Sequence, residues 1–308
     1  MTLWLVDQRS KRSRPPVKHF PPQGPSLDPY RGAVADLVAE IEKSAPEDSR
    51  QAERILTSRL TDGDFAAVLS ATAEGTSATI ARIAFEVRNH EPPEDPSRSL
   101  AALIRNSLLA QVDAVWWGRW PGYLTDADVY DSSDLVDVDA LEQDGRLRFR
   151  YRHQASTLLT RAVRSAERRA LPGRSPRTAG LATPRSRPQT VFWLNQLAEE
   201  FALRAPYGTP PLWVTSLTRS IAHQQHLKSL GYLALLPSSH CVGYAADIEM
   251  AWYRRFHAHR LLRGLLLDRQ RADEVNLIDE GQVWHVCLRP EVVHGPRPLP
   301  RQRARTDG

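Results

Sequence analysis

The sequence predicts an α+β protein in which a mostly helical N-terminal region precedes a small antiparallel sheet with helices around it. Apolar residues recur at helical spacing through much of the first 120 residues. After residue 189, short apolar strands alternate with amphipathic helices. A stretch rich in proline, glycine and arginine separates the two regions.

Composition sets the limits of this interpretation. The chain has 308 residues, of which 41% are hydrophobic and 25% charged, so it has room for two globular domains. It contains no run of about 18 apolar residues that could cross a membrane. The few apolar residues at the N-terminus precede the basic cluster, which is the reverse of a secretory signal, so we expect a cytoplasmic protein with no membrane partner.

The chain is basic, with a net charge of +5, and only four of its 41 lysines and arginines are lysines. These basic residues gather in proline-rich segments at the ends of the chain rather than on one helix face. No nucleic-acid partner is therefore expected.

Residues 1–28 form a basic, proline-rich arm that we expect to be disordered. The domain at 29–170 is expected to be mostly helical, with Asp28 capping the first helix and Gly75 interrupting the third. The expected helices are Pro29–Lys43, Ser49–Leu60, Asp64–Asn89, Ser97–Trp117 and His153–Arg169.

A β-hairpin is predicted inside this helical domain. Asp144-Gly145 is a strong signal for a two-residue turn, and the sequence RLRFRYR that follows alternates strictly between apolar and basic residues. Aspartates that precede the turn could pair across the hairpin with these arginines. Their spacing over 126–139 does not match a calcium-binding loop, so a solvated surface is the better interpretation.

The proline- and arginine-rich stretch at 171–188 is interpreted as a linker, followed by a second domain at 189–290 and a disordered basic tail at 291–308. In the second domain the expected helices are Thr190–Arg204, Ser220–Leu230 and Trp252–Gln270. Strands are expected at Leu212–Leu217 and Val283–Leu288, and the segment HCVGYAADIEM is expected to run from a loop into a strand.

Three short motifs in this second domain suggest chemistry. SSHCVGYAAD places His240 and Asp247 seven residues apart, with Gly243 permitting a sharp turn between them. QVWHV places His285 on an apolar strand, where a buried imidazole needs a partner. Neutral histidine and carboxylate are ordinary zinc ligands, and a catalytic zinc site uses three protein ligands and a water. Arg219 stands at a strand-to-helix junction before both motifs.

Together the motifs resemble the M15 metallopeptidases, which include zinc D-alanyl-D-alanine carboxypeptidases and share a fold with the hedgehog signalling domain. The resemblance covers roughly 100 residues. It implies that His240, Asp247 and His285 bind Zn²⁺. It also implies that Arg219, in SLTR with Gln224 downstream, holds a substrate carboxylate or an oxyanion.

The chain departs from the family at one position. These peptidases usually carry a glutamate three residues before the last histidine, and that glutamate is the general base. Gln282 stands there in this chain, and a glutamine cannot accept a proton from water at pH 7. Glu280 is the predicted base, with Asp279 and Glu249 as alternatives.

The resemblance thus implies a zinc-dependent peptidase or amidase that acts on a peptide or a cell-wall-precursor-like substrate. Gln282 keeps an alternative open, namely a catalytically impaired zinc module that binds a peptide or a protein partner. Cys241 and Cys287 flank the proposed ligands. We expect both to be small buried hydrophobic residues, with a thiolate near the metal or a disulfide between them as alternatives.

Overall fold

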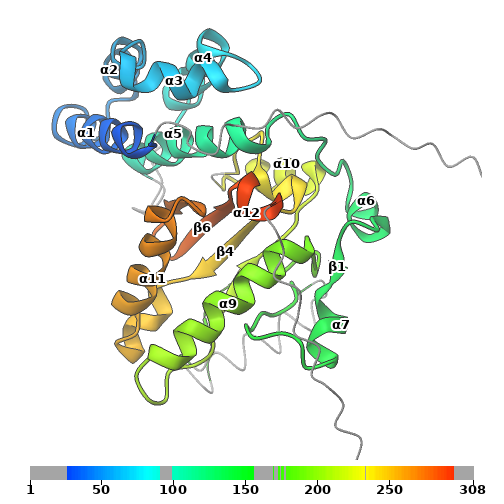
Figure 1. Cartoon of the computed structure of the whole chain (residues 1–308). Helices are drawn as coiled ribbons and strands as arrows, with labels where there is room; N and C mark the ends of the chain where they lie inside the picture. The colour runs from blue at the N-terminus through cyan, green and yellow to red at the C-terminus, as the bar shows by residue number, and fades with distance from the viewer. Residues whose placement is uncertain are drawn as a thin grey trace, which may run out of the picture.

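The computed structural model describes residues 26–90, 99–155, 169, 173, 175–176, 178–232 and 234–294. Its N-terminal part is a bundle of helices above the rest of the molecule (Figure 1). These helices are α1 (Asp28–Ser44), α2 (Ser49–Arg59), α3 (Gly63–Ala71), α4 (Thr76–Arg88) and α5 (Leu100–Trp117).

The bundle agrees with the helices predicted for this region. It encloses its own hydrophobic core, to which all five helices contribute. The predicted third helix is two helices, because Gly75 adopts a φ of 77° that an α-helix cannot contain. Asp28 is the first residue of α1 and does not cap it, since the N-cap is Leu27 and no side chain bonds there.

The predicted hairpin is wrong. The segment before Asp144 forms a short helix, α7 (Val138–Gln143), because the Asp137 carboxylate accepts the first free N–H groups of that helix. Gly145, with a φ of 68°, follows the end of this helix instead of turning a hairpin. The alternating segment behind it is extended, and Phe149 is buried in the core, but Arg150 makes only a single parallel bridge to Trp213.

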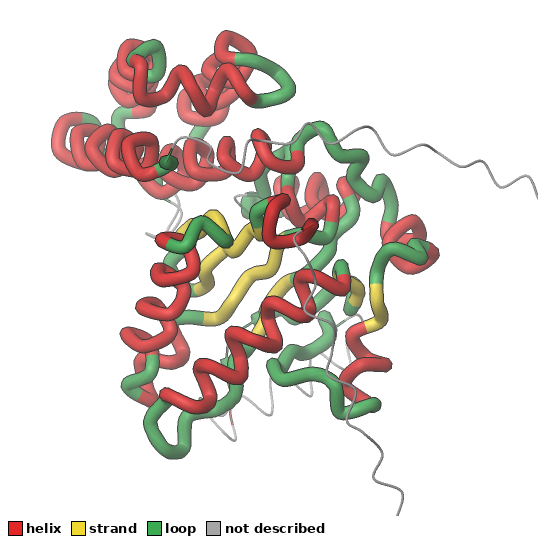
Figure 2. Tube along the Cα trace, in the orientation of Figure 1, coloured by secondary structure: helices red, strands yellow, loops and turns green. Residues whose placement is uncertain are grey.

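A four-stranded antiparallel sheet forms the centre of the C-terminal part (Figure 2). Its order is β3-β4-β6-β5. The strands are β3 (Val214–Ser216), β4 (Ala245–Glu249), β5 (Val275–Asp279) and β6 (Val283–Leu288). The sequence predicted strands at the positions of β3 and β6, and it predicted that the segment HCVGYAADIEM runs from a loop into a strand, which is β4. Strand β5 was not predicted.

Helices cover the apolar face of this sheet. α9 (Pro188–Arg204) and α11 (His259–Arg271) lie beside the strands in Figure 1, and their buried residues share one hydrophobic core with them. The predicted helix over 252–270 is broken, because His257 adopts a φ of 55° between the 3₁₀-helix η3 (Ala251–Phe256) and α11. The chain also forms a helix, α12 (Pro290–His294), at the start of the predicted tail.

The remaining elements are short. They are α6 (Asp126–Asp131), β1 (Val136–Asp137), β2 (Arg185–Ser186), α10 (Ile221–Ser229) and the 3₁₀-helix η2 (Ser239–Val242). Strand β2, within the predicted linker, pairs with β1, and Leu181 is buried in the core, so this end of the predicted linker is packed. The division into domains stays a prediction.

Several expectations fall outside the described residues. These are the disordered arm over 1–25, most of the helix predicted over 153–169, and the tail beyond residue 294. Within the described part, no helix is both long and apolar enough to cross a membrane.

Helix α5 joins the two parts of the molecule. Its first four turns contribute to the core of the bundle, whereas Trp117 at its end belongs to the core of the sheet. The Trp117 ring stacks on Tyr244 with 4.0 Å between centroids, and its Nε1 donates to the carbonyl of Leu288. The aromatic rings around Trp117 therefore pack together, and α5 spans both cores.

Candidate metal centre

Strand register brings the first two candidate ligands together. Asp247 on β4 lies directly opposite His285 on β6, so both side chains leave the same face of the sheet. Ser216 on β3 and Ile278 on β5 complete this row across the four strands. The row lies on the face opposite α9 and α11, so the site is formed where the sheet is not covered by those helices.

His240 reaches the same point from the turn before β4. It lies in η2, and Gly243, with a φ of 83°, ends that turn and directs the chain into the strand. The His240 Nδ1–H donates to the carbonyl of Leu217 at 2.7 Å. This hydrogen bond leaves the Nε2 lone pair of His240 pointing toward Asp247.

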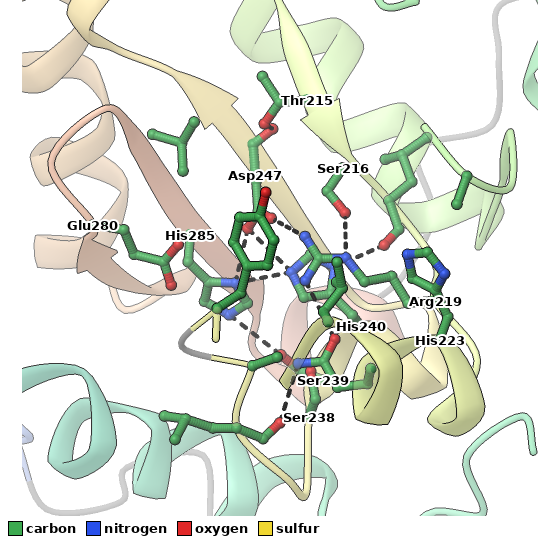
Figure 3. Close-up of a pocket in the computed structure, with 18 of the residues that line it drawn as sticks. Thr215, Ser216, Arg219, His223, Ser238, Ser239, His240, Asp247, Glu280 and His285 are labelled. Atoms are coloured by element: carbon green, nitrogen blue, oxygen red, sulfur yellow. Dashed lines mark hydrogen bonds and ion pairs between the residues drawn. The ribbon is translucent and has the colours of Figure 1, made fainter. Parts of the chain in front are cut away.

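Three ligand atoms form an almost equilateral triangle (Figure 3). His240 Nε2 lies 3.0 Å from Asp247 Oδ1, and His285 Nδ1 lies 3.1 Å from each of them. All three residues are buried. Tetrahedral zinc with bonds of 2.0–2.1 Å separates its ligands by about 3.3 Å, so small outward shifts would fit the triangle to that ion.

The protons around this triangle show why it needs a cation. In neutral His240 the proton is on Nδ1, toward Leu217, and in neutral His285 it is on Nε2, which lies 2.8 Å from Asp113 Oδ2. All three converging atoms would then present lone pairs to one another with no proton between them. Either an additional proton or a metal ion must occupy this position, and the residue types fit a metal.

The pKa values of these residues show which of them would hold a proton when no metal ion is bound. Burial lowers the pKa of His240, so this imidazole is neutral. Burial would also lower the pKa of His285, but the hydrogen bonds and charges of Asp113 and Asp247 raise it to about 10. Burial disfavours the Asp247 carboxylate, yet His240 and Arg219 hold its pKa well below the usual range. Without a metal, His285 thus carries a second proton in addition to the one on Nε2, and a bound metal ion would displace that second proton.

Arg219 lies in the same site, as its predicted role requires. Its guanidinium donates to Asp247 Oδ2 at 2.5 Å, to Ser216 Oγ at 2.7 Å and to Gln224 Oε1 at 3.3 Å. Arg219 therefore occupies one carboxylate oxygen of Asp247 and leaves Oδ1 for a metal. Its role as a clamp for substrate stays a prediction.

A cavity of about 530 Å³ opens onto the triangle and is lined by Arg219, Glu280 and Gln282 as well as by the ligands. The Glu280 side chain lies beside His285 in Figure 3. Burial and the negative charge of Asp247 raise the pKa of Glu280 to about 7. Glu280 therefore lies in the same cavity as the candidate ligands, whereas the Glu249 carboxylate accepts a hydrogen bond from the backbone of Trp252.

Asp113 is a member of the site that the sequence analysis missed. It comes from α5, and its carboxylate accepts hydrogen bonds from His285 and Ser239, both at 2.8 Å, and from Asn276 at 2.9 Å. The signal in the sequence was an acidic residue inside the otherwise apolar stretch LLAQVDAVWW. Its partner, however, lies 172 residues away and follows only from the packing of α5 on β5 and β6.

The cysteines are buried and free, so they form no disulfide. Neither belongs to the group that could hold a metal. Burial raises the pKa of Cys241 to about 12 and that of Cys287 well above its usual value, which disfavours the thiolate. Both cysteines are the small buried residues that the sequence predicted.

No family model, no curated protein and no solved structure matches this chain. The candidate site is therefore supported by its geometry alone. His240, Asp247 and His285 form a buried group that can bind a metal ion.

Proposed function

We propose that this protein is a zinc-dependent peptidase or amidase of the M15 type, acting on a peptide or a cell-wall-precursor-like substrate. The observation that carries the proposal is the triangle of His240, Asp247 and His285 at the wall of a cavity that also contains Glu280. Two nitrogens and one oxygen are the ligands of a catalytic zinc site, and the cavity gives a substrate access to them.

The proposed hydrolysis would use three groups, which are the metal ion, Glu280 and Arg219. A bound zinc ion would polarise the scissile carbonyl and lower the pKa of a water molecule. Glu280 accepts the proton of the attacking water and passes it to the leaving amine, a task suited to a group whose pKa is about 7. Arg219 keeps Asp247 ionised and oriented, and because it also lines the cavity, its guanidinium is the candidate partner for a substrate carboxylate or an oxyanion.

The rival function is a zinc module that binds a peptide or a protein without cleaving it. Gln282 favours this alternative, because it occupies the position of the usual glutamate and lines the cavity. A glutamine can hold a peptide group by donating and accepting hydrogen bonds, but it cannot move a proton.

Zinc content tests the shared basis of both functions. We expect the purified protein to hold about one zinc per chain, as a three-ligand site does, and His240→Ala to lose it. His226→Ala is the matched control, because His226 lies exposed on α10 and outside the triangle. Equal zinc in wild type and His240→Ala, measured by metal analysis after dialysis, would refute the metal centre and both functions with it.

A further inference from the structure

One acidic side chain beside the proposed metal centre, Asp113, belongs to none of the ligand motifs and has three hydrogen-bond partners. Asp113 is 4% exposed and lies on the last turns of α5. Its Oδ2 accepts from His285 Nε2 and from Ser239 Oγ, and its Oδ1 accepts from Asn276 Nδ2. A buried carboxylate needs such partners, and here they come from three elements of the C-terminal part.

We propose that Asp113 is the positioning residue of the metal centre, and that α5 thereby makes the helical bundle a working part of that centre. This inference rests on the metal site of the proposed function, but not on hydrolysis. By accepting the Nε2–H of His285, Asp113 fixes the tautomer whose Nδ1 lone pair faces His240 and Asp247. A carboxylate partner on the far nitrogen also makes a metal-binding histidine a stronger ligand.

The hydrogen-bond partners of Asp113 hold its carboxylate in this orientation. The Asn276 side chain donates both to Asp113 and to the carbonyl of Leu109, which lies one turn earlier on α5. These two hydrogen bonds fix the position of Asn276 against the helix. Ser239 adjoins His240 in η2, and its hydroxyl links that turn to the same carboxylate. One acidic residue of the bundle thus touches β5, β6 and the turn that carries His240.

The bundle in turn holds α5 in place. The Tyr30 hydroxyl of α1 donates to the carbonyl of Leu108 at 2.6 Å. At the sheet, Arg105 donates to the carbonyl of Asp279, two turns before Asp113. These contacts fix the axial position of the helix, so a shift of α5 would move the carboxylate away from His285.

Asp113→Asn tests the proposal with little change in volume. If the amide oxygen faces His285, the amide nitrogen meets the donor of Asn276. If the amide is reversed, its nitrogen meets Nε2 and forces the His285 proton onto the ligand atom Nδ1. Either outcome weakens the site, and we expect zinc affinity, measured by competition with a chromophoric chelator, to fall about 10–100-fold.

Val112→Ala is the matched control, because Val112 is buried in the bundle core next to Asp113 and the change loosens α5 without touching the carboxylate. Nitrogen-15 NMR of zinc-loaded wild type should show the His285 proton on Nε2, which a merely structural role would not require. The proposal is wrong if Asp113→Asn binds zinc within twofold of wild type, if Val112→Ala loses as much affinity, or if the proton is on Nδ1. If wild type binds no zinc at all, the proposed function fails instead.

Discussion

Two carboxyl groups at this site differ because their surroundings differ. Arg219 and His240 stabilise the ionised form of Asp247 in spite of burial, whereas the half-buried Glu280 is desolvated beside the Asp247 charge and its pKa rises to about 7. One is suited to bind a metal and the other to carry a proton. If the proposed function is correct, this difference between Asp247 and Glu280 is what would distinguish an enzyme from a binding module.

We predict that Glu280→Gln lowers hydrolysis of short peptides ending in a free carboxylate by about 10²–10⁴-fold, while zinc content is unchanged. Wild-type activity should rise with pH through about 7, because the base must lose its proton, and fall below that value. Asp279→Asn is the matched change at the neighbouring carboxylate and should have little effect.

Full activity in Glu280→Gln would remove Glu280 as the base and leave Asp279 or Glu249 as the candidate. Gln282→Glu introduces, at the cavity wall, the glutamate that M15 peptidases usually carry. If wild type cleaves none of these peptides and Gln282→Glu does, the binding module replaces the enzyme as the function.

The sequence was sufficient to predict which residues form the triangle, because His240, Asp247 and His285 stand in short motifs. It was insufficient for Asp113, whose contact with His285 spans 172 residues. Motifs report local geometry, whereas contacts between distant elements depend on packing that no local pattern encodes.

At the level of elements, the turn η2 and its final glycine determine how His240 meets the sheet. A Cβ on Gly243 would lie 3.0 Å from Arg187 Cγ and 3.1 Å from Leu135 Cδ2, and the φ of 83° disfavours any side chain there. The approach of His240 to Asp247, seven residues later in the chain, therefore depends on Gly243.

We predict that Gly243→Ala destabilises the protein by about 1–3 kcal/mol through the strained backbone, and that it also weakens zinc binding. Gly264→Ala is the control, because a Cβ at this position in α11 meets nothing within 4 Å, and it should stabilise the helix by about 0.5–1 kcal/mol. Chemical denaturation gives the free energy of unfolding. An unchanged value and unchanged zinc affinity for Gly243→Ala would contradict the prediction.

Elements were predicted well where one signal dominated and badly where two competed. The bundle helices and β6 followed from periodicity alone. The Asp144-Gly145 pair indicated a turn correctly, but capping by Asp137 made the preceding segment helical and so removed one arm of the hairpin. The break at His257 had no glycine or proline to announce it.

At the scale of the whole molecule, α5 belongs to both hydrophobic cores and supplies Asp113 to the candidate metal centre. A ligand that binds only the folded form stabilises everything that unfolds with its site. We predict that zinc at about 100 times its Kd adds about 2.7 kcal/mol to the free energy of unfolding. Hydrogen exchange should then slow in α1 and α5 as well as in the sheet.

The control for this measurement is His240→Ala, in which zinc should change exchange nowhere. Protection that appears in β4 and β6 but not in α1 or α5 would show that the bundle opens independently of the metal centre. It would then be a separate cooperative unit.

The pairing of Asp247 with His285 across two strands makes metal capture a test of correct assembly. Side chains alternate between the faces of a sheet, so a slip of one residue between β4 and β6 would leave one ligand on each side. A refolding chain could hold the right strands in a wrong alignment and still bind no zinc. The time at which a refolding sample first binds zinc would therefore report when β4 and β6 reach their native register. This measurement does not depend on any probe of secondary structure.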